Sequence, residues 1–459
     1  MMDTVTAARA VHGQLRGDNV RFTRVATDTR TLAPGDLFVA IKGERFDGHD
    51  FVGVAFERGA AAALVAAEHA NALAGNLIAA PDSLAALGAL AAYWRARFAI
   101  PVIVIVGSNG KTTVKEMLAA ILRAHFGEAH VLATEGNFNN AIGLPLTLLR
   151  MHSGHEVAAI ELGMNHRGET AELAAIAQPT VAVINNAQRE HQEFMQGIAD
   201  VAAEHAALVR ALPDGGIAVL NADDPNADLW RTAARERRDV RVVEFALEHP
   251  AAIHLRGPLP PAGDVLEVST PLGDAKMRID APGRHNAANA LAAATAAFAI
   301  GVPLAAMVAG LKSFRPVAGR LALLQAVSGA AVLDDTYNAN PDSVRAAIDV
   351  LAARPPPRWL VLGDMGEVGA NGPDFHREVG EYARVARIDR LLAVGALAAQ
   401  SAMAFGPGAE HFASVESLAT LVAATARAGT TVLVKGSRFM RMERVVAALC
   451  GPPIAAGGH

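Results

Sequence analysis

The strongest chemical signal in the sequence is a glycine-rich turn between a buried strand and a helix. Gly107-Ser108-Asn109-Gly110-Lys111-Thr112-Thr113 follows the apolar run 102–106 and precedes a segment whose apolar residues recur with a helical period. Glycine lets backbone amides point at phosphate oxygens, and a helix N-terminus adds partial positive charge. Lys111 could then reach the β- and γ-phosphates of a nucleotide, and the Thr112 hydroxyl could bind Mg²⁺. The full phosphate-loop pattern needs glycine where the chain has Ile105, so a plain strand-to-helix turn is the alternative.

Two further side chains follow neighbouring predicted strands. Glu161 lies at the C-terminal end of the strand expected over 157–162, the edge at which ligands of open α/β sheets gather. With Thr112 it would supply oxygen ligands for Mg²⁺. His191 follows the next strand, and a structural hydrogen-bonding role is the better interpretation of this residue taken alone. A solvated side chain at a strand end is the alternative for Glu161.

The elements that must position these residues predict an α/β fold. Apolar runs typical of strands buried on both faces alternate with helical segments, which implies mostly parallel sheets covered by helices. A chain of 459 residues exceeds one ordinary core, so several domains are expected. The strands are expected over 36–41, 102–106, 157–162, 180–184, 217–220, 331–333, 359–362, 391–394 and 431–434, and the helices over 84–98, 201–212, 343–351 and 375–385.

Composition narrows the function classes. The formal net charge of −5 gives no basic footprint for nucleic acid or an anionic membrane. A single cysteine, Cys450, forms neither an internal disulfide nor a thiolate-rich zinc site. The start of the chain lacks the apolar core of a secretory signal, and the alanine-rich stretch 287–306 is too weakly hydrophobic to span a membrane. We therefore expect a cytoplasmic protein that does not insert into membranes.

Together these motifs resemble the Mur ligases, and the resemblance covers nearly the whole chain. It implies three domains: a small α/β UDP-sugar-binding domain over 1–82, a central phosphate-loop ATPase domain with a mostly parallel sheet over 83–315, and a C-terminal Rossmann-like domain over 316–459 that takes the incoming dipeptide. The strings that carry it, in order, are 28–30, 34–40, 46–51, 107–113, 161–165, His191, 283–289, 334–341, 361–367 and 434–438.

The resemblance also implies a reaction. A carboxylate would attack the γ-phosphate of ATP to give an acyl phosphate, and an amine would then displace phosphate, with Mg²⁺ as the metal. The strings 336–341 and 363–367 favour members of the family that join D-alanyl-D-alanine to UDP-N-acetylmuramoyl-tripeptide in peptidoglycan precursor synthesis. No nucleic-acid partner is implied, and we expect a monomer.

Site residues follow from the same resemblance. The catalytic set is Lys111, Glu161, His191 and Arg320, and the metal ligands include Thr112, Glu161 and His191. Turn formation, helix capping or an ordinary surface position is the alternative for most of the remaining residues. The ATP contacts would be Gly107, Ser108, Asn109, Gly110, Lys111, Thr112, Thr113, Asn286, Asn289, Arg320 and Asp335, and the substrate contacts Thr29, Arg30, Asp47, Asn139, Asn140, Asn338, Asn340, Lys435, Ser437 and Arg438, with His376 a weaker candidate.

One departure from the family pattern concerns the second metal. The family usually has a lysine beyond the metal-binding histidine, and carbamylation of that lysine provides a further carboxylate. The region 200–206 of this chain has no lysine. We hypothesise that Glu204 supplies the carboxylate directly, with His205 as the alternative ligand, whereas ordinary helix-surface positions are the plain interpretation of both.

Two rival functions would also use a phosphate loop of this kind. One is another ligase of the same superfamily, such as a folylpolyglutamate synthase, which the segment 337–341 disfavours. The other is a nucleotide-binding regulatory protein that hydrolyses ATP without ligation, which predicts ATPase activity independent of any amine.

Overall fold

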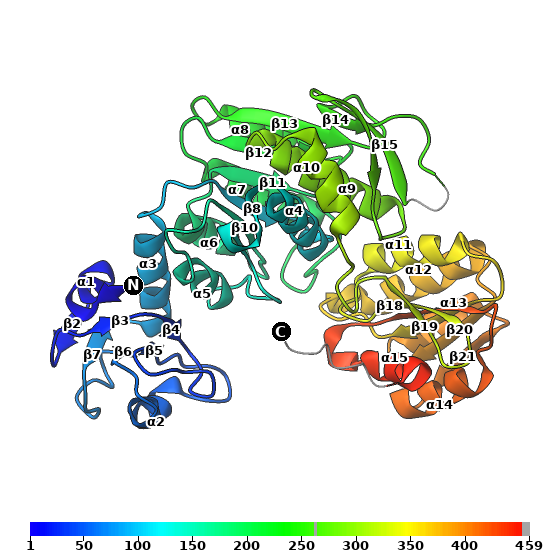
Figure 1. Ribbon diagram of the computed structural model, residues 1–459. Helices are drawn as coiled ribbons and strands as arrows, with labels where there is room; N and C mark the ends of the chain where they lie inside the picture. The colour runs from blue at the N-terminus through cyan, green and yellow to red at the C-terminus, as the bar shows by residue number, and fades with distance from the viewer. Residues whose placement is uncertain (261–263, 452–459) are drawn as a thin grey trace.

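The computed structural model describes residues 1–260 and 264–451. The predicted ranges 83–315 and 316–459 therefore include positions outside the described residues. The chain forms three α/β domains, arranged along the chain from blue to red (Figure 1). Each domain is built on one main sheet, of five, nine and six strands respectively. These sheets fall inside the three predicted ranges, whose exact boundaries stay a prediction.

The N-terminal domain holds the five-stranded sheet, in the order β2-β7-β6-β5-β4, with only β2 antiparallel. Its central strands consist almost wholly of buried apolar residues because helices and loops cover both faces. The elements are β1 (Met2–Asp3), α1 (Thr4–Ala10), β2 (Gln14–Arg16), β3 (Arg21–Phe22), β4 (Val25–Ala26), β5 (Leu37–Val39), the 3-10 helix η1 (Gly48–Phe51), α2 (Val52–Glu57), β6 (Ala62–Ala66) and β7 (Leu77–Ala80).

Helix α3 (Ser83–Arg95) connects this domain to the next. Asp82 caps its N-terminus by accepting a hydrogen bond from the Ala85 amide at 2.7 Å. Leu87 and Leu90 belong to one hydrophobic cluster that includes side chains from both domains. Because α3 packs against α5 and α6 as well as α1, it fixes the N-terminal domain against the central one.

The central domain carries the nine-stranded sheet, in the order β16-β15-β14-β13-β12-β11-β8-β10-β9. All strands from β9 to β14 in this order run parallel, whereas β15 and β16 form an antiparallel hairpin at one end. The strands are β8 (Val102–Val106), β9 (Val131–Ala133), β10 (Val157–Glu161), β11 (Val181–Ile184), β12 (Ile217–Asn221), β13 (Arg241–Ala246), β14 (Ile253–Leu255), β15 (Val265–Thr270) and β16 (Gly273–Arg278).

Helices cover both faces of this sheet, so β8 is buried on each side. Val104 packs toward α5–α8, whereas Ile105 packs toward α4, α9 and α10. The alanine-rich α9 is a buried core helix, which explains a stretch of small apolar residues without any membrane role. The helices are α4 (Lys111–Phe126), η2 (Glu128–His130), α5 (Gly143–Leu149), α6 (Glu169–Ala177), α7 (Ile198–Arg210), α8 (Ala227–Arg235), α9 (Arg284–Ala299) and α10 (Leu304–Ser313).

The C-terminal domain has the six-stranded sheet, in the order β17-β18-β22-β19-β20-β21, with only β17 antiparallel. Helices α11–α13 cover one face, and α14 and α15 cover the other. The elements are β17 (Ala322–Gln325), β18 (Ala331–Asp335), α11 (Pro341–Ala352), β19 (Arg358–Gly363), η3 (Gly369–Asn371), α12 (Gly372–Val385), β20 (Arg390–Val394), α13 (Ala398–Phe405), β21 (Ala409–Phe412), α14 (Val415–Thr425), β22 (Thr431–Lys435), η4 (Arg438–Met440) and α15 (Glu443–Cys450).

The predicted α/β class and its parallel sheets are confirmed, and the predicted strands agree with the structure to within one or two residues. Several strands were not predicted from the sequence, among them β9, β13 to β16, β17 and β21. The hairpin strand β16 carries mostly polar residues and lies at the sheet edge, so it lacks the apolar run used to find buried strands. Within residues 1–260 and 264–451, no helix combines the length and apolar character needed to cross a membrane.

Candidate active site between two domains

A cavity of about 590 Å³ lies between the central and C-terminal domains. On the central side it is lined by the turn at the start of α4, by the ends of β10 and β11, and by the start of α9. On the other side it is lined by the segment 335–343 and by Lys435 at the end of β22. The carboxyl ends of parallel strands from two sheets thus face one space, the usual place for a ligand in such folds.

The turn 107–113 makes the tight approach that was predicted for a phosphate loop. Gly110 is the N-cap of α4 with φ of +86°, a conformation that favours glycine. A Cβ there would lie 2.3 Å from Asn289 Oδ1, so a side chain is also excluded by space. The segment after β11 holds the loop in place. Asn186 Oδ1 accepts from the Asn109 amide at 2.9 Å, and Ser108 Oγ accepts from the Gln188 amide at 2.8 Å.

Lys111 is held inside this loop by three acceptors. Its Nζ donates to Gly107 O at 2.5 Å and to Ser108 O at 3.4 Å, and lies 3.3 Å from Glu190 Oε2. Glu190 is buried, and its second oxygen lies 3.4 Å from His205 Nε2. Burial alone would raise the pKa of Glu190, but Lys111 and the neighbouring His205 and His191 outweigh it and hold that pKa well below its usual range. Glu190 received no role from the sequence, although an acid directly before His191, in the segment that follows β11, was the available signal.

Glu161 joins the phosphate loop to the segment 137–140. Its Oε2 accepts from Thr112 Oγ1 at 2.8 Å, and its Oε1 accepts from Asn139 Nδ2 at 2.7 Å. Both Glu161 and Thr112 are buried at the cavity wall. A carboxylate beside a hydroxyl gives the hard oxygen donors that Mg²⁺ prefers, so these residues fit the ion that was predicted here.

His191 completes the predicted metal set from the other side of the cavity. Its Nδ1 lies 2.6 Å from Glu367 Oε2 in the C-terminal domain. The close approach of His191 is the main reason that the pKa of Glu367 is lowered. Nε2 lies 3.8 Å from Glu190 Oε2, so the ring faces the carboxylate that pairs with Lys111. His191 therefore lies between a central-domain acid and a C-terminal acid.

The opposite end of the cavity carries amide and imidazole groups. Asn289 Oδ1 accepts from Asn185 Nδ2 at 2.8 Å, and Asn289 Nδ2 donates to Asn286 Oδ1 at 3.1 Å. Burial lowers the pKa of the adjacent His285 to about 4, with Asp335 opposing and Lys435 assisting the shift, so this ring is neutral near pH 7. His285 received no role from the sequence, although it lies inside the string 283–289.

Two cationic side chains line the cavity from the C-terminal side: Lys435 in the C-terminal domain, and Arg320 near its junction with the central domain. Lys435 Nζ donates to Asp335 Oδ2 at 2.5 Å and to Asn338 O at 2.9 Å. The Arg320 guanidinium lies 4.1 Å from the centroid of the Tyr337 ring, which holds it at the cavity wall by a cation–π contact. Asn340 caps α11 and donates from Nδ2 to Asn109 Oδ1 at 2.9 Å, so the phosphate loop touches the C-terminal domain directly.

The cavity brings together most of the predicted site residues. Those that line it are Ser108, Asn109, Gly110, Lys111, Thr112, Thr113, Asn139, Asn140, Glu161, His191, Asn286, Asn289, Arg320, Asp335, Asn338, Asn340 and Lys435. Within the described part of the chain, Gly107, Thr29, Arg30, Asp47, Glu204, Ser437 and Arg438 lie outside that lining.

Glu204, the hypothesised metal ligand, has backbone partners outside the cavity lining. Its two carboxylate oxygens accept hydrogen bonds from the amides of Gly168 and Thr170, at 3.0 and 2.8 Å. Glu204 therefore caps the N-terminus of α6, where a negative charge is favourable. The neighbouring His205 lies on a different face of α7 and points to Glu190. Of the two candidates for this position, His205 is the one that reaches the network around Lys111.

We expect Glu204→Ala to lower stability without changing the Mg²⁺ requirement. Loss of the cap leaves two amides of α6 without their acceptor, which should lower the free energy of unfolding by about 1–2 kcal/mol. Thermal melting and a Mg²⁺ titration of turnover would measure both effects. A large rise in the Mg²⁺ concentration at half-maximal rate, with unchanged melting, would restore the original hypothesis.

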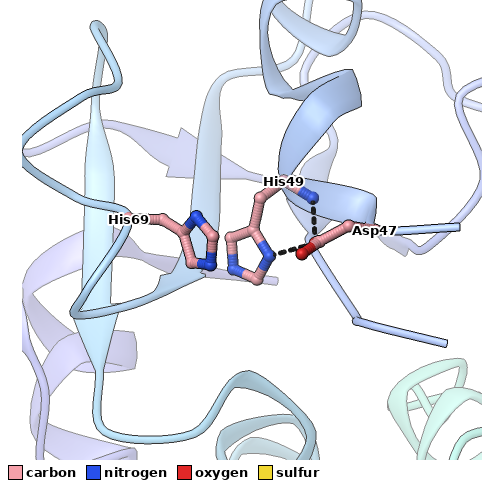
Figure 2. Close-up of side chains that lie close together, drawn as sticks. All are labelled: Asp47, His49 and His69. Atoms are coloured by element: carbon pink, nitrogen blue, oxygen red, sulfur yellow. Dashed lines mark hydrogen bonds and ion pairs between the residues drawn. The ribbon is translucent and has the colours of Figure 1, made fainter.

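Asp47 belongs to a tight cluster in the N-terminal domain (Figure 2). Its Oδ1 accepts from the His49 amide at 3.0 Å and lies 2.6 Å from His49 Nδ1, while His69 stacks on His49 with ring centroids 4.0 Å apart. These three side chains are close enough to hold a metal ion. However, His49 Nε2 accepts from the Ala66 amide at 2.9 Å, so neither ring nitrogen of His49 has a free lone pair. The cluster stabilises the turn 47–51.

The other predicted residues outside the cavity make local contacts. Arg30 pairs with Asp28 on the surface, and Thr29 O accepts from Arg58. Ser437 Oγ accepts from the Gly366 amide at 2.6 Å and donates to Ala339 O, so it supports the loop before Glu367. Arg438 is largely exposed.

His376, the weaker candidate, is fully buried and has a structural role. Its Nε2 accepts from the Met365 amide, and its Nδ1 lies 2.7 Å from Gly372 O. Both ring nitrogens are therefore used by the backbone, and we withdraw it from the site.

A phosphate loop, an adjacent carboxylate and hydroxyl, and a facing domain with its own cations define a nucleotide-dependent enzyme of the α/β class. The chain matches three family models, described as Mur ligase family, catalytic domain (21–124), Mur ligase middle domain (105–297) and Mur ligase, glutamate ligase domain (319–438). It is 41% identical over 445 residues to the UDP-N-acetylmuramoyl-tripeptide–D-alanyl-D-alanine ligase of Escherichia coli K12, covering 96% of each chain.

Solved structures agree with these matches. A crystal structure of MurF from Acinetobacter baumannii aligns with a TM-score of 0.88 and 32% identity, covering 97% of this chain and 98% of that one. The MurF ligase of Thermotoga maritima in complex with ADP aligns with a TM-score of 0.81 and 28% identity, covering 93% and 96%. The chain therefore belongs to the Mur ligase family and is an ATP-dependent ligase that forms amide bonds.

Proposed function

We propose that the chain joins D-alanyl-D-alanine to the free carboxylate of UDP-N-acetylmuramoyl-tripeptide, with ATP as the energy source, in peptidoglycan precursor synthesis. The products are UDP-N-acetylmuramoyl-pentapeptide, ADP and phosphate. The observation that carries the proposal is one cavity that joins the phosphate loop to the segment 335–340 of the C-terminal domain. The relative with 41% identity bears the name of this activity.

In the first step, a carboxylate oxygen of the tripeptide attacks the γ-phosphorus of ATP. The bond from that phosphorus to the bridging oxygen breaks, and ADP leaves with the electron pair. Two unit charges of like sign at 4 Å repel by about 4 kcal/mol at an intermediate effective dielectric, so the approach needs cations. Lys111 and Arg320 supply them from opposite domains. Mg²⁺, held by Thr112, Glu161 and His191, would neutralise further phosphate charge.

In the second step, the neutral amine of the dipeptide attacks the acyl carbon of the acyl phosphate. The carbon–oxygen bond breaks, phosphate leaves with the former carboxylate oxygen, and the amine loses one proton. Most of the remaining catalysis is positioning, because three substrates must meet in one space. Asn139 and Asn140 on the central side and Asn338, Asn340 and Lys435 on the other are proposed to hold the two peptides.

The remaining assignments concern the UDP-sugar, the dipeptide and the adenosine part of ATP, and they include residues outside the cavity lining. We place the UDP-sugar in the N-terminal domain beside Thr29, Arg30 and the turn at Asp47, and the dipeptide near Ser437 and Arg438. Asn286, Asn289 and Asp335 would hold the adenosine part of ATP. ATP and UDP-linked precursors are cytoplasmic metabolites, so the enzyme is assigned to the cytoplasm, and it is expected to act as a monomer. Sedimentation velocity would test whether the enzyme is a monomer in solution.

A phosphate-release assay separates this function from its rivals. The enzyme is given ATP, Mg²⁺ and UDP-muramoyl-tripeptide with either diaminopimelate or lysine as third residue, with and without D-alanyl-D-alanine. We expect sustained release only when the tripeptide and the dipeptide are both present, with one pentapeptide formed per phosphate. Release that is equally fast without the dipeptide would indicate an ATPase that does not ligate. Sustained release when free glutamate replaces the dipeptide would indicate another ligase of the superfamily.

A further inference from the structure

Arg189 links the central domain to the C-terminal domain through two carboxylates. It lies in the loop between β11 and α7, whereas Asp342 is in the first turn of α11 and Glu378 is in α12. Its Nη2 lies 2.6 Å from Asp342 Oδ1, and its Nη1 lies 2.7 Å from Glu378 Oε2. Both helices lie on the side of the C-terminal domain that faces the central domain (Figure 1).

The contact has more than the two ion pairs. The Arg189 amide donates to Asp342 Oδ2 at 2.9 Å, and the guanidinium donates to both oxygens of each carboxylate. The guanidinium carbon also lies 5.2 Å from the centroid of the Phe375 ring. The Arg189 side chain is only 18% exposed. The planar guanidinium of Arg189 is bound by two carboxylates and lies near an aromatic ring. These contacts fix both its orientation and its distance from the C-terminal domain, which an ordinary exposed ion pair does not do.

The same loop holds the phosphate loop. Gln188, directly before Arg189, accepts at Oε1 from Asn109 Nδ2 at 2.6 Å, and its amide donates to Ser108 Oγ. Asn109 in turn contacts Asn340, the N-cap of α11, two residues before Asp342. The loop 185–191 therefore contacts the phosphate loop on one side and the start of α11 on the other. Its position decides where the C-terminal domain lies relative to a bound nucleotide.

We propose that Arg189 is a positioning residue that holds the start of α11 against the phosphate loop, and so brings the C-terminal half of the site to the reacting phosphate. Arg189 lines the cavity next to the phosphate loop, but its guanidinium is paired with Asp342 and Glu378, through which it acts. Its loss leaves the phosphate loop, Lys111 and interdomain contacts such as Asn109–Asn340 and His191–Glu367 in place, but lets the C-terminal domain open more readily. The kinetic part of this inference rests on the proposed function, whereas the structural part does not.

The test compares Arg189→Ala with Arg345→Ala in the full-length enzyme. Arg345 Nη1 lies 3.0 Å from the same Glu378, but both residues belong to the C-terminal domain. Small-angle scattering without substrates gives the radius of gyration, and steady-state kinetics give kcat/KM for the dipeptide. We expect Arg189→Ala to increase the radius and to lower kcat/KM for the dipeptide at least tenfold, with its KM rising more than that of ATP. Arg345→Ala should change neither quantity, and Arg189→Lys should restore part of both.

Unchanged scattering with unchanged kcat/KM in Arg189→Ala would overturn the inference, as would an equal effect of Arg345→Ala. An enzyme that fails to use D-alanyl-D-alanine would refute the proposed function alone, because the scattering comparison still decides whether Arg189 holds the domains together. Matching thermal melting curves and circular dichroism show that the variants are folded.

Discussion

Replacing Lys111 with alanine is expected to lower turnover at least about 10³-fold, equivalent to about 4 kcal/mol in the activation barrier. Lys111 is held at the start of α4 by Gly107 O and Glu190, inside the turn that faces the cavity. Its cation would lie where negative charge accumulates on the transferring phosphoryl group. Single-turnover measurement of ADP formation reports the loss directly, because it does not depend on product release.

The control must allow for the buried carboxylate that Lys111 neutralises. Without the cation, Glu190 would keep an unpaired negative charge in a buried position, which is costly. The double variant Lys111→Ala/Glu190→Gln removes that charge and should stay inactive while it melts close to the wild type. Lys276→Ala, an exposed lysine in the β15–β16 hairpin, should retain full activity. Near-normal turnover in the double variant would contradict the assignment of Lys111.

Glu161→Gln is expected to lower kcat by about 10²–10³-fold and to raise the Mg²⁺ concentration at half-maximal rate by about tenfold. Glutamine has nearly the same shape. Its amide oxygen can still accept from Asn139 Nδ2, and its NH2 group can donate to the Thr112 hydroxyl, which then acts as the acceptor. What it lacks is the negative charge, so the variant separates the metal role from the structural one. Mn²⁺ binding followed by electron paramagnetic resonance gives a readout that does not depend on turnover.

Glu204 provides the matched comparison. It is also a buried glutamate that accepts two hydrogen bonds, but it lies outside the cavity and its partners are backbone amides. If Glu161 binds the metal because it lies at the cavity, and not merely because it is a buried glutamate, the Glu204→Gln variant should bind Mn²⁺ as the wild type does. Equal weakening of Mn²⁺ binding in both variants would show that Glu161 acts only through the fold.

The local parts of the site could be predicted from the sequence. The phosphate loop is short and continuous in the sequence. The chemistry of phosphate binding explains why glycine, lysine and threonine stand at their positions in it. Glu161 was found because a buried apolar run ends at it, and strand ends in a parallel sheet meet at one edge. Both predictions depend on residues close together in the chain, where the period of apolar residues fixes the direction of each side chain.

The parts that join distant segments could not be predicted. Glu204 and His205 are neighbours on α7 and both are buried, so composition alone does not say which one faces the phosphate loop. The apolar stripe of α7 includes Val201 and Leu208, and His205 lies along that stripe. That pattern would have favoured His205, but its partner Glu190 comes from another element. The pairing of Arg189 with Asp342 and Glu378 joins residues from two domains, and no local sequence pattern predicts such a contact.

The central claim is that a carboxyl oxygen of the muramoyl peptide becomes bonded to the terminal phosphorus of ATP. It is tested most directly with UDP-muramoyl-tripeptide whose terminal carboxylate carries ¹⁸O, followed by mass analysis of the phosphate released in the presence of D-alanyl-D-alanine. We expect each released phosphate to carry one oxygen from that carboxylate, because the acyl carbon–oxygen bond breaks in the second step. Unlabelled phosphate accompanied by pentapeptide formation would contradict the account.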